Sequence, residues 1–316
     1  MKKRRMIISL AVAISMAWTM LFTFTLPVDA ASKKWDLPES ATVYTLKQDE
    51  HGNNIQGQWE VNRVDRFKYN KRGYIVRYDA SYFPDSSSPS LTTEKTKWTV
   101  KRGKISKISK RTVKNTFKSD GEVSGSTATA KYTKGKLKKE TRKGGLSGGK
   151  YTSSYSYNKR GWITKSTDKH GSVKYHITYH KNGMPKKISV KYGSVLQYVG
   201  SQSYTMYFNK KGLMTKRLTV IGDAKVMLAT STGDVTGNGG DAKDLFSYSY
   251  DKKGRVSSVS MKEYIDGKYI ETRRVIYKYG KKKTSDKRLY FGIMNRHTPA
   301  AQVCKDLLPG ELASTV

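Results

Sequence analysis

The residue types that most often carry out chemistry are present in this sequence, but their spacing does not favour a metal site. His176 and His180 lie four residues apart on a predicted strand, which separates them by roughly 13 Å at about 3.3 Å per residue. They cannot share one ion. His51 and His170 lie in or beside predicted turns, and no HExxH spacing accompanies any of them. We therefore predict that these histidines lie at the surface and bind no metal.

Nucleophilic catalysis has equally little support. Cys304 is the single cysteine, which excludes an intrachain disulfide, and no general base stands near it in the sequence. No phosphate-cradling loop of the G-x-x-x-x-G-K-[ST] type is present. The letters of G-x-S-x-G occur once, at residues 145–149, but they lie in a Gly- and Ser-rich stretch that we expect to be a loop and not a strand-to-helix elbow. We predict that the protein is not an enzyme, has no catalytic residue and uses no cofactor.

One loop resembles the calcium loop of dockerin modules. In residues 233–245, Asp234, Thr236 and Asn238 stand at the first, third and fifth ligand positions, and Gly239 stands at the sharp turn. The loop is one residue short, because Asp244 arrives at position eleven instead of twelve. We therefore expect no calcium site between Asp234 and Asp244.

The charge balance indicates the partners. The chain of 316 residues has 61 Lys plus Arg and 25 Asp plus Glu, a formal net charge of +36. Such a surface attracts an anionic cell-wall polymer or polysaccharide, and a membrane surface is a further candidate. The hydrophobic content of 36% is below that of an average domain, so we expect no large, deep core. We also expect the protein to be a monomer.

The N-terminus has the pattern of a secretory signal. Four basic residues at positions 2–5 precede the uncharged stretch 6–26, and small residues follow around Ala30. This pattern predicts a signal peptide over residues 1–30, with cleavage after Ala30 and secretion. Residues 6–26 are also long enough to span a bilayer, so a membrane-anchored form in the cell envelope is the alternative.

A short unit recurs along the chain: aromatic or apolar residues two apart, then Asn, Asp or His, two mostly basic residues and Gly. Such recurrence indicates an array of equivalent units. The unit itself predicts a β-hairpin, because its Gly supplies a left-handed turn position and the flanking residues alternate with period two. The five clear copies are residues 67–77, 155–165, 177–184, 206–216 and 248–256.

These hairpins predict a mostly β fold, a repeat-built antiparallel meander that follows an N-terminal signal helix. We assign residues 31–290 to this β-hairpin repeat domain and residues 291–316 to an atypical C-terminal tail, with a candidate helix at 298–312. Long loops are expected where Gly and Ser gather, at residues 81–93, 121–127, 143–150 and 231–241.

Residues 157–183 resemble the tyrosine-aspartate (YD, Rhs-type) repeat of bacterial surface proteins. An aromatic residue, Asn and a Gly turn are followed by a second Gly turn and the aromatic pair Tyr175 and Tyr179. The resemblance implies an extracellular, β-rich surface or carbohydrate-associated module without catalysis. Of the family's Asp, only Asp251 is present, and the spacing of the copies is irregular.

Two sets of residues are therefore candidates for binding. Basic pairs at the hairpin tips form the polyanion-binding set, which comprises Lys71, Arg72, Lys159, Arg160, Lys210, Lys211, Lys252 and Lys253. Aromatic residues that stack on sugars from an open sheet form the carbohydrate-binding set, comprising Tyr74, Trp162, Tyr175 and Tyr179. For these rings we favour packing in the core, since aromatic pairs across strands stabilise sheets, and sugar stacking is the alternative. An extracellular interaction scaffold is the alternative to polymer binding.

Overall fold

The computed structural model describes most of the chain between residues 34 and 308. The described ranges are 34–49, 54–83, 90–101, 104–117, 123–133, 136–144, 150–169, 171–192, 202–221, 228–230, 233–235, 242–265, 267–296 and 298–308. The predicted signal segment, His51 and His170 lie outside these ranges. Of the helices in the described ranges, none is long and apolar enough to cross a membrane.

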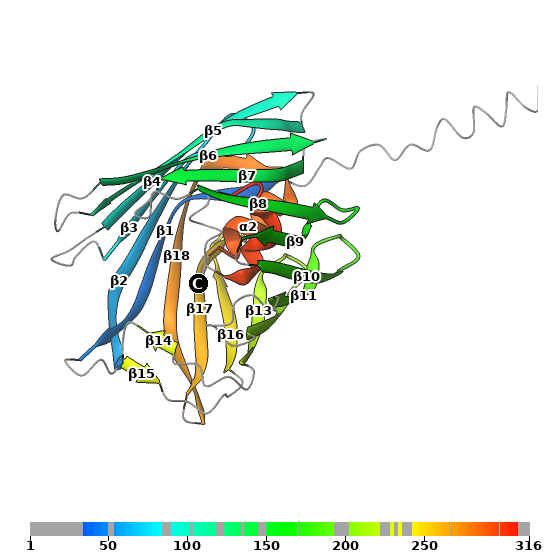
Figure 1. Ribbon diagram of the computed structural model, residues 1–316. Coiled ribbons are helices and arrows are strands. Elements are labelled where there is room, and N and C mark those ends of the chain that lie inside the picture. Colours follow the sequence, from blue (N-terminus) through cyan, green and yellow to red (C-terminus); the bar gives the residue numbers. More distant parts are fainter. Residues whose placement is uncertain are drawn as a thin grey trace, which may run out of the picture.

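Sixteen antiparallel strands form one closed barrel, in which each strand pairs with its neighbours and β1 closes the ring between β18 and β2 (Figure 1). This confirms the predicted mostly β meander. The wall consists of β1 (Trp35–Gln48), β2 (Asn54–Tyr69), β3 (Ile75–Tyr82), β4 (Ser90–Lys101), β5 (Lys104–Phe117), β6 (Val123–Thr133), β7 (Lys136–Gly144), β8 (Lys150–Tyr157), β9 (Ile163–Asp168), β10 (Gly171–Tyr179), β11 (Pro185–Tyr192), β12 (Gln202–Phe208), β13 (Met214–Ile221), β16 (Ala242–Tyr250), β17 (Val256–Ile265) and β18 (Lys268–Thr284). A separate hairpin pairs β14 (Leu228–Thr230) with β15 (Gly233–Val235).

Several expected long loops are partly strand. β6 begins at Val123, so most of the Gly- and Ser-rich stretch 121–127 belongs to the wall. β4 begins at Ser90 and β7 continues to Gly144. Small residues do not prevent extended backbone when a neighbouring strand satisfies its hydrogen bonds, which sequence composition alone does not reveal.

The alternation along the strands separates an apolar inside from a polar outside. In β10, Tyr175 is buried while Lys174 and His176 are exposed. In β11, Ile188 and Val190 are buried in the same way. An outer-membrane barrel has the reverse pattern, with an apolar band on its outer face. The outer face of β10 and β11 is therefore built to contact water.

The repeated units form the predicted hairpin turns. In four of the five, the side chain of Asn70, Asn158, Asn209 or Asp251 accepts hydrogen bonds from the backbone N–H groups two and four residues later. The Gly of each of the five turns has φ between +72° and +85°, a region that favours glycine. A register shift precedes each turn, as expected for a bulge.

All five repeat turns lie at one end of the barrel. Successive turns of a meander alternate between two ends, so the turns that follow β2, β8, β10 and β12 share one end. The turn after β16 joins them, because β14 and β15 leave the wall and β16 pairs antiparallel with β13. β18 also ends there and β1 begins there. We call this end the repeat rim.

The C-terminal segment after β18 turns into the barrel and fills its interior on the rim side (Figure 1). It contains α2 (Lys287–Met294) and the 3-10 helix η1 (Pro299–Cys304), and we call residues 286–308 the plug. The domain boundary expected at residue 291 falls within α2. Of the range 298–312, where we expected a helix, the structure describes residues 298–308, and these contain only the short η1. α2 lies before that range and was not predicted, because its residues 289–294 are all buried and lack a polar face.

The plug contributes side chains to every hydrophobic cluster of the described residues. Phe291 packs with Trp162 and Phe208, Ile293 packs with the cluster around Tyr78, and Met294 packs with the cluster around Val259. A sixteen-stranded barrel without a plug encloses an aqueous channel. The expectation of no deep core was therefore wrong, because one short segment covers the apolar inner faces of strands from all around the wall.

Candidate functional site

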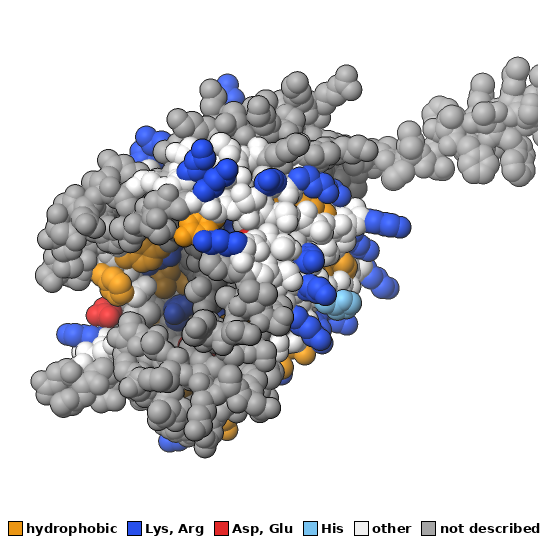
Figure 2. Space-filling view, in the orientation of Figure 1, with side chains coloured by type: hydrophobic (Ala, Val, Ile, Leu, Met, Phe, Trp, Pro, Cys, Tyr) orange, Lys and Arg blue, Asp and Glu red, His pale blue; other side chains and the backbone are white. Residues whose placement is uncertain are grey.

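The predicted polyanion-binding residues are brought together on the repeat rim. All eight are exposed, and each pair lies at the tip of its turn. Lys181, the corresponding residue of the 177–184 repeat, is exposed on the same rim. On the face shown in Figure 2, Lys and Arg side chains are numerous and acidic side chains are few among the described residues. We call these nine residues the basic rim.

Neighbouring turns of the basic rim bond to one another. Asn182 donates from Nδ2 to the backbone carbonyl of Lys210 at 2.7 Å, and Nε2 of His180 lies 2.9 Å from the carbonyl oxygen of Phe208. The turn between β8 and β9 also bonds to its neighbour, because Asn158 donates to the hydroxyl of Tyr179 at the end of β10. These contacts hold three of the five repeat tips, those after β8, β10 and β12, in a fixed spacing.

A cavity of about 410 Å³ opens among the tips, and we call it the rim cavity. Six basic side chains line it with one acidic side chain, Asp36, which lies 3.3 Å from Lys283. Trp35 and Tyr290, stacked at 5.8 Å between ring centroids, supply an apolar wall. The basic lining residues are Lys34, Lys210, Lys211, Lys253, Arg255 and Lys287.

Three of these lining residues were missed by the sequence reasoning. Lys34 precedes β1, Lys287 begins the plug helix, and Arg255 follows the turn glycine, where other copies carry Tyr, Trp, Met or Leu. Only Arg255 lies within a repeat, directly after the turn glycine, so only this residue could have been predicted from the repeat pattern. Lys34 and Lys287 reach the rim because β1 and the plug both start there, which is a consequence of barrel closure.

Cation–π contacts hold several rim cations over aromatic rings. Lys211 Nζ lies 4.2 Å from the centroid of the Tyr250 ring, and the Arg255 guanidinium lies 4.6 Å from that of Tyr279. Such contacts order the stems of the side chains while the charges stay accessible. The rim therefore presents partly pre-positioned cations.

The carbohydrate-binding set is not an open face. Trp162 and Tyr175 are buried in the barrel core, which confirms the favoured core-packing role for them and excludes their exposure as a sugar-stacking surface. Tyr74 and Tyr179 are half-buried and pack against the core from the rim side. The physical reason is that aromatic residues two apart share the inward face of a strand, where the plug covers them.

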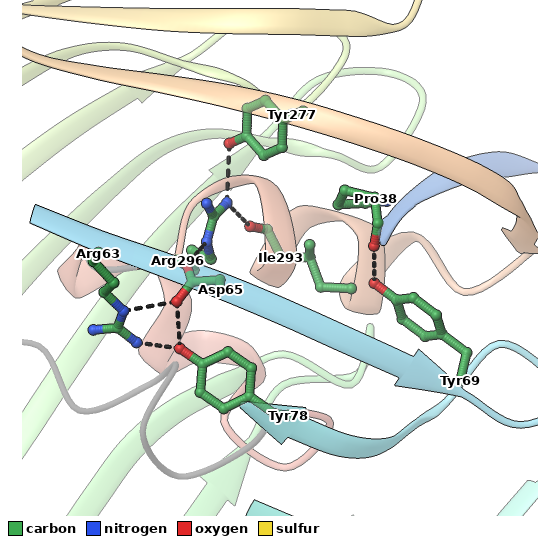
Figure 3. A network of polar contacts seen from close by, with 8 residues as sticks. All are labelled: Pro38, Arg63, Asp65, Tyr69, Tyr78, Tyr277, Ile293 and Arg296. Atoms are coloured by element: carbon green, nitrogen blue, oxygen red, sulfur yellow. Dashed lines mark hydrogen bonds and ion pairs between the residues drawn. The ribbon is translucent and has the colours of Figure 1, made fainter. Parts of the chain in front are cut away.

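A buried ion pair locks the plug to the wall (Figure 3). Arg296 donates from Nε to Asp65 on β2 at 2.8 Å and from Nη1 to the Tyr277 hydroxyl on β18 at 3.1 Å. Ala41 of β1 lies between them in register, and its small side chain leaves room for the guanidinium. Burial alone would lower the pKa of Arg296, but Tyr277 and Asp65 raise it above its ordinary value.

A second buried pair fixes the plug beneath the rim. Arg288 donates to Asp306 at 3.0 Å and to the backbone carbonyl of Gly161 in the β8–β9 turn. Burial opposes the charge of Arg288, while Asp306 raises the pKa of its guanidinium above the ordinary value. The repeat turn is thus attached directly to the plug.

The other candidate groups have structural surroundings. Cys304 is buried, and burial raises the pKa of its thiol well above the ordinary value, which disfavours the nucleophilic thiolate. Asp244, the last acid of the dockerin-like loop, accepts from Arg217 Nε at 2.5 Å. Residues 236–241 of that loop lie outside the described ranges. The described residues contain no group of three or more His, Cys, Asp or Glu able to hold a metal ion.

Comparison with known proteins gives limited information. No family model matches the chain, and no curated protein matches it. A porin-like protein from Bacteroides uniformis has a similar structure, with 12% identity over 77% of this chain and 96% of that chain and a TM-score of 0.47. A porin-like protein from Bacteroides vulgatus has 9% identity over 78% of this chain and 99% of that chain and a TM-score of 0.32. Neither similarity bears on function, and the resemblance to YD repeats stays a prediction.

Proposed function

We propose that this is an exported, non-catalytic protein of the cell envelope or its surroundings that binds an anionic wall or extracellular polymer through the basic rim. The observation that supports the proposal most directly is the placement of all five repeat turns at one end of the barrel. Because hydrogen bonds fix neighbouring tips relative to one another, a flexible polyanion can engage several cations at once. Linked contacts of this kind add avidity to individually weak interactions.

The rim cavity strengthens this proposal. Its six basic side chains face one acid, and its mixed lining of charge and aromatic ring suits a polymer that alternates anionic groups with less polar units. The signal pattern of residues 1–30 supports export, and the polar outer face of β10 and β11 supports a form in which this part of the wall contacts water. Adhesion, rather than turnover, fits the absence of a catalytic constellation in the sequence.

The test is retention of the mature protein on dextran sulfate, with neutral dextran as the comparator, across a salt series from about 0.05 M to about 0.5 M. Exposed charges are screened beyond roughly 10 Å at 0.1 M salt, so we expect retention on dextran sulfate to fall steeply. The isolated cell-envelope fraction should behave in the same way. Equal retention on the two dextrans would overturn the proposal.

Two variants with equal loss of charge separate the basic rim from general basicity. The rim variant combines Lys210→Ser, Lys211→Ser, Lys252→Ser and Lys253→Ser on two neighbouring turns. The wall variant combines Lys138→Ser, Lys139→Ser, Lys174→Ser and Lys191→Ser, all exposed on strands. We expect the rim variant to lose retention and the wall variant to keep most of it. Equal effects would assign binding to net charge alone, and unaltered retention in both would favour the interaction-scaffold alternative.

A further inference from the structure

A second cavity lies inside the barrel, beyond the end of the plug helix. It has a volume of about 530 Å³, within the range of roughly 300–1,000 Å³ for small-ligand sites. Its lining comes from four plug residues and from strands β1, β2, β3, β13, β16, β17 and β18; the plug residues are Met294, Asn295, Arg296 and Thr298. We call it the lumen cavity. It does not share a lining residue with the rim cavity.

One part of the lumen cavity is apolar and regular. Val43, Val275 and Val259 lie directly opposite one another on three adjacent strands. Met261 pairs with Phe246 in the next row, and Met214 and Met294 add flexible thioethers. Methionine adapts its shape to an apolar guest. This part of the cavity suits a hydrocarbon chain.

The other part is cationic, with four arginines in the lining. Three of them are paired: Arg63 and Arg296 with Asp65 at 2.7 and 2.8 Å, and Arg217 with Asp244 at 2.5 Å. Arg273 is the exception, because it forms no hydrogen bond or ion pair with a described residue. The wall confines its guanidinium, Glu263 and Asp244 attract its charge at longer range, and Arg217 repels it. One nitrogen of Arg296, Nη2, is also buried without a hydrogen-bond partner in the described part of the chain.

Arg273 faces the lumen and not the outside. It pairs across strands with Met261 on β17, and both residues line the lumen cavity. Its neighbour Arg274 points outward, where it contacts Glu271 and the ring of Trp59. Arg273 is accessible to solvent although the wall surrounds it. A charged guanidinium with free donors in a confined space is a ready site for a planar anion.

We propose that the lumen cavity binds a small amphiphilic monocarboxylate, with its carboxylate on Arg273 and its hydrocarbon chain along the valine and methionine rows. The charge count of the cavity as a whole favours one negative charge. Arg63 and Arg296 share the carboxylate of Asp65, Arg217 pairs with Asp244, and Glu263 attracts Arg273 at longer range, which leaves one positive charge. A carboxylate matches the two parallel donors of a guanidinium. This proposal concerns a site separate from the basic rim and does not rest on the proposed function.

The experiment measures binding of dodecanoate to the mature protein by titration calorimetry, with dodecanol and acetate as comparators. Arg273→Met removes the free charge, and we expect it to weaken dodecanoate binding at least about tenfold, since hydrogen bonds to charged groups contribute about 1.5–3 kcal/mol. The matched control is Arg274→Met, one residue along the same strand and facing outward. It should bind dodecanoate within about twofold of the parent protein.

Further variants and ligands test the proposal even if Arg273→Met alters the fold. Arg273→Lys retains the charge but loses the two parallel donors, so it should bind dodecanoate more weakly than the parent and more tightly than Arg273→Met. Circular dichroism checks each variant. The rim variant should bind dodecanoate like the parent, which separates this site from the basic rim. Equal binding by Arg273→Met and Arg274→Met, equal binding of dodecanol, or tighter binding of dodecyl phosphate than of dodecanoate would overturn the monocarboxylate proposal.

Discussion

The protein uses positive charge in opposite ways at the repeat rim and inside the barrel. At the rim the cations are mainly lysines, exposed at the hairpin tips. Inside, they are arginines, and Arg63, Arg217, Arg288 and Arg296 each pair with a carboxylate. Lysine is a strongly hydrated point charge, whereas arginine offers a planar fork of donors that a buried carboxylate can satisfy. Arg288 and Arg296 thereby position the plug, whereas we propose that the rim cations contact a partner.

Substitution of Arg296 should produce the largest loss of stability. Arg296→Met leaves Asp65 buried with Arg63 and Tyr78 as its remaining hydrogen-bond donors, and breaking a buried pair lowers the free energy of unfolding by about 3–5 kcal/mol. We expect a value near the lower end because Arg63 remains. Urea denaturation measures the change, with Arg72→Met on the rim as the control expected to change stability by less than about 0.5 kcal/mol. Similar losses of unfolding free energy in the two variants would contradict the difference between buried interior cations and exposed rim cations.

Two turn glycines allow a sharper comparison within the rim. Gly212 and Gly254 have φ of +78° and +72°, so Ala is strained at either position. A Cβ at Gly212 would also lie 3.2 Å from Met184 Sδ and Phe291 Cδ2, whereas a Cβ at Gly254 would meet nothing within 4 Å. We expect Gly254→Ala to lower stability by about 1 kcal/mol and Gly212→Ala by about 1–3 kcal/mol through crowding. A larger effect at Gly254, measured by thermal unfolding, would contradict the close packing of this turn on the plug.

The smallest effect is expected for an ion pair on the outer wall. Arg274 lies near Glu271, with Nε 3.0 Å from Oε1, and this hydrogen bond lowers the pKa of the Glu271 carboxyl. Because the pKa in the folded state is below the unfolded value of about 4.3, the stabilisation is complete above that pH and is lost as the pH falls through the folded value.

Glu271→Gln should therefore lower stability by less than about 1 kcal/mol at neutral pH, and the difference from the parent should shrink below about pH 4. Urea unfolding at several pH values measures it. A difference that stays constant down to about pH 3 would show that charge is not its cause.

The local structure was readable from the sequence because it depends on residues close together in the chain. The Asn or Asp, the two basic residues and the Gly of each repeat predict a bulged hairpin, and the turns at Asn158 and Asn209 have that form. Period-two alternation in β10 similarly predicts one solvated face. The eight basic tip residues follow from the same local pattern.

Three features depended on the tertiary structure. Closure of the sheet required β1 to pair with β18, a contact between the two ends of the chain that no local pattern encodes. The gathering of the tips on one rim depended on β14 and β15 leaving the wall, which returned β16 to the direction of β12. The burial of Trp162 and the ion pairs of Arg288 and Arg296 depended on the plug. The sequence by itself determined the hairpins, their charged tips and their alternation, because turn chemistry and side-chain period act over a few residues. Which faces became core, and which charges became neighbours, was decided only when distant segments enclosed a common interior.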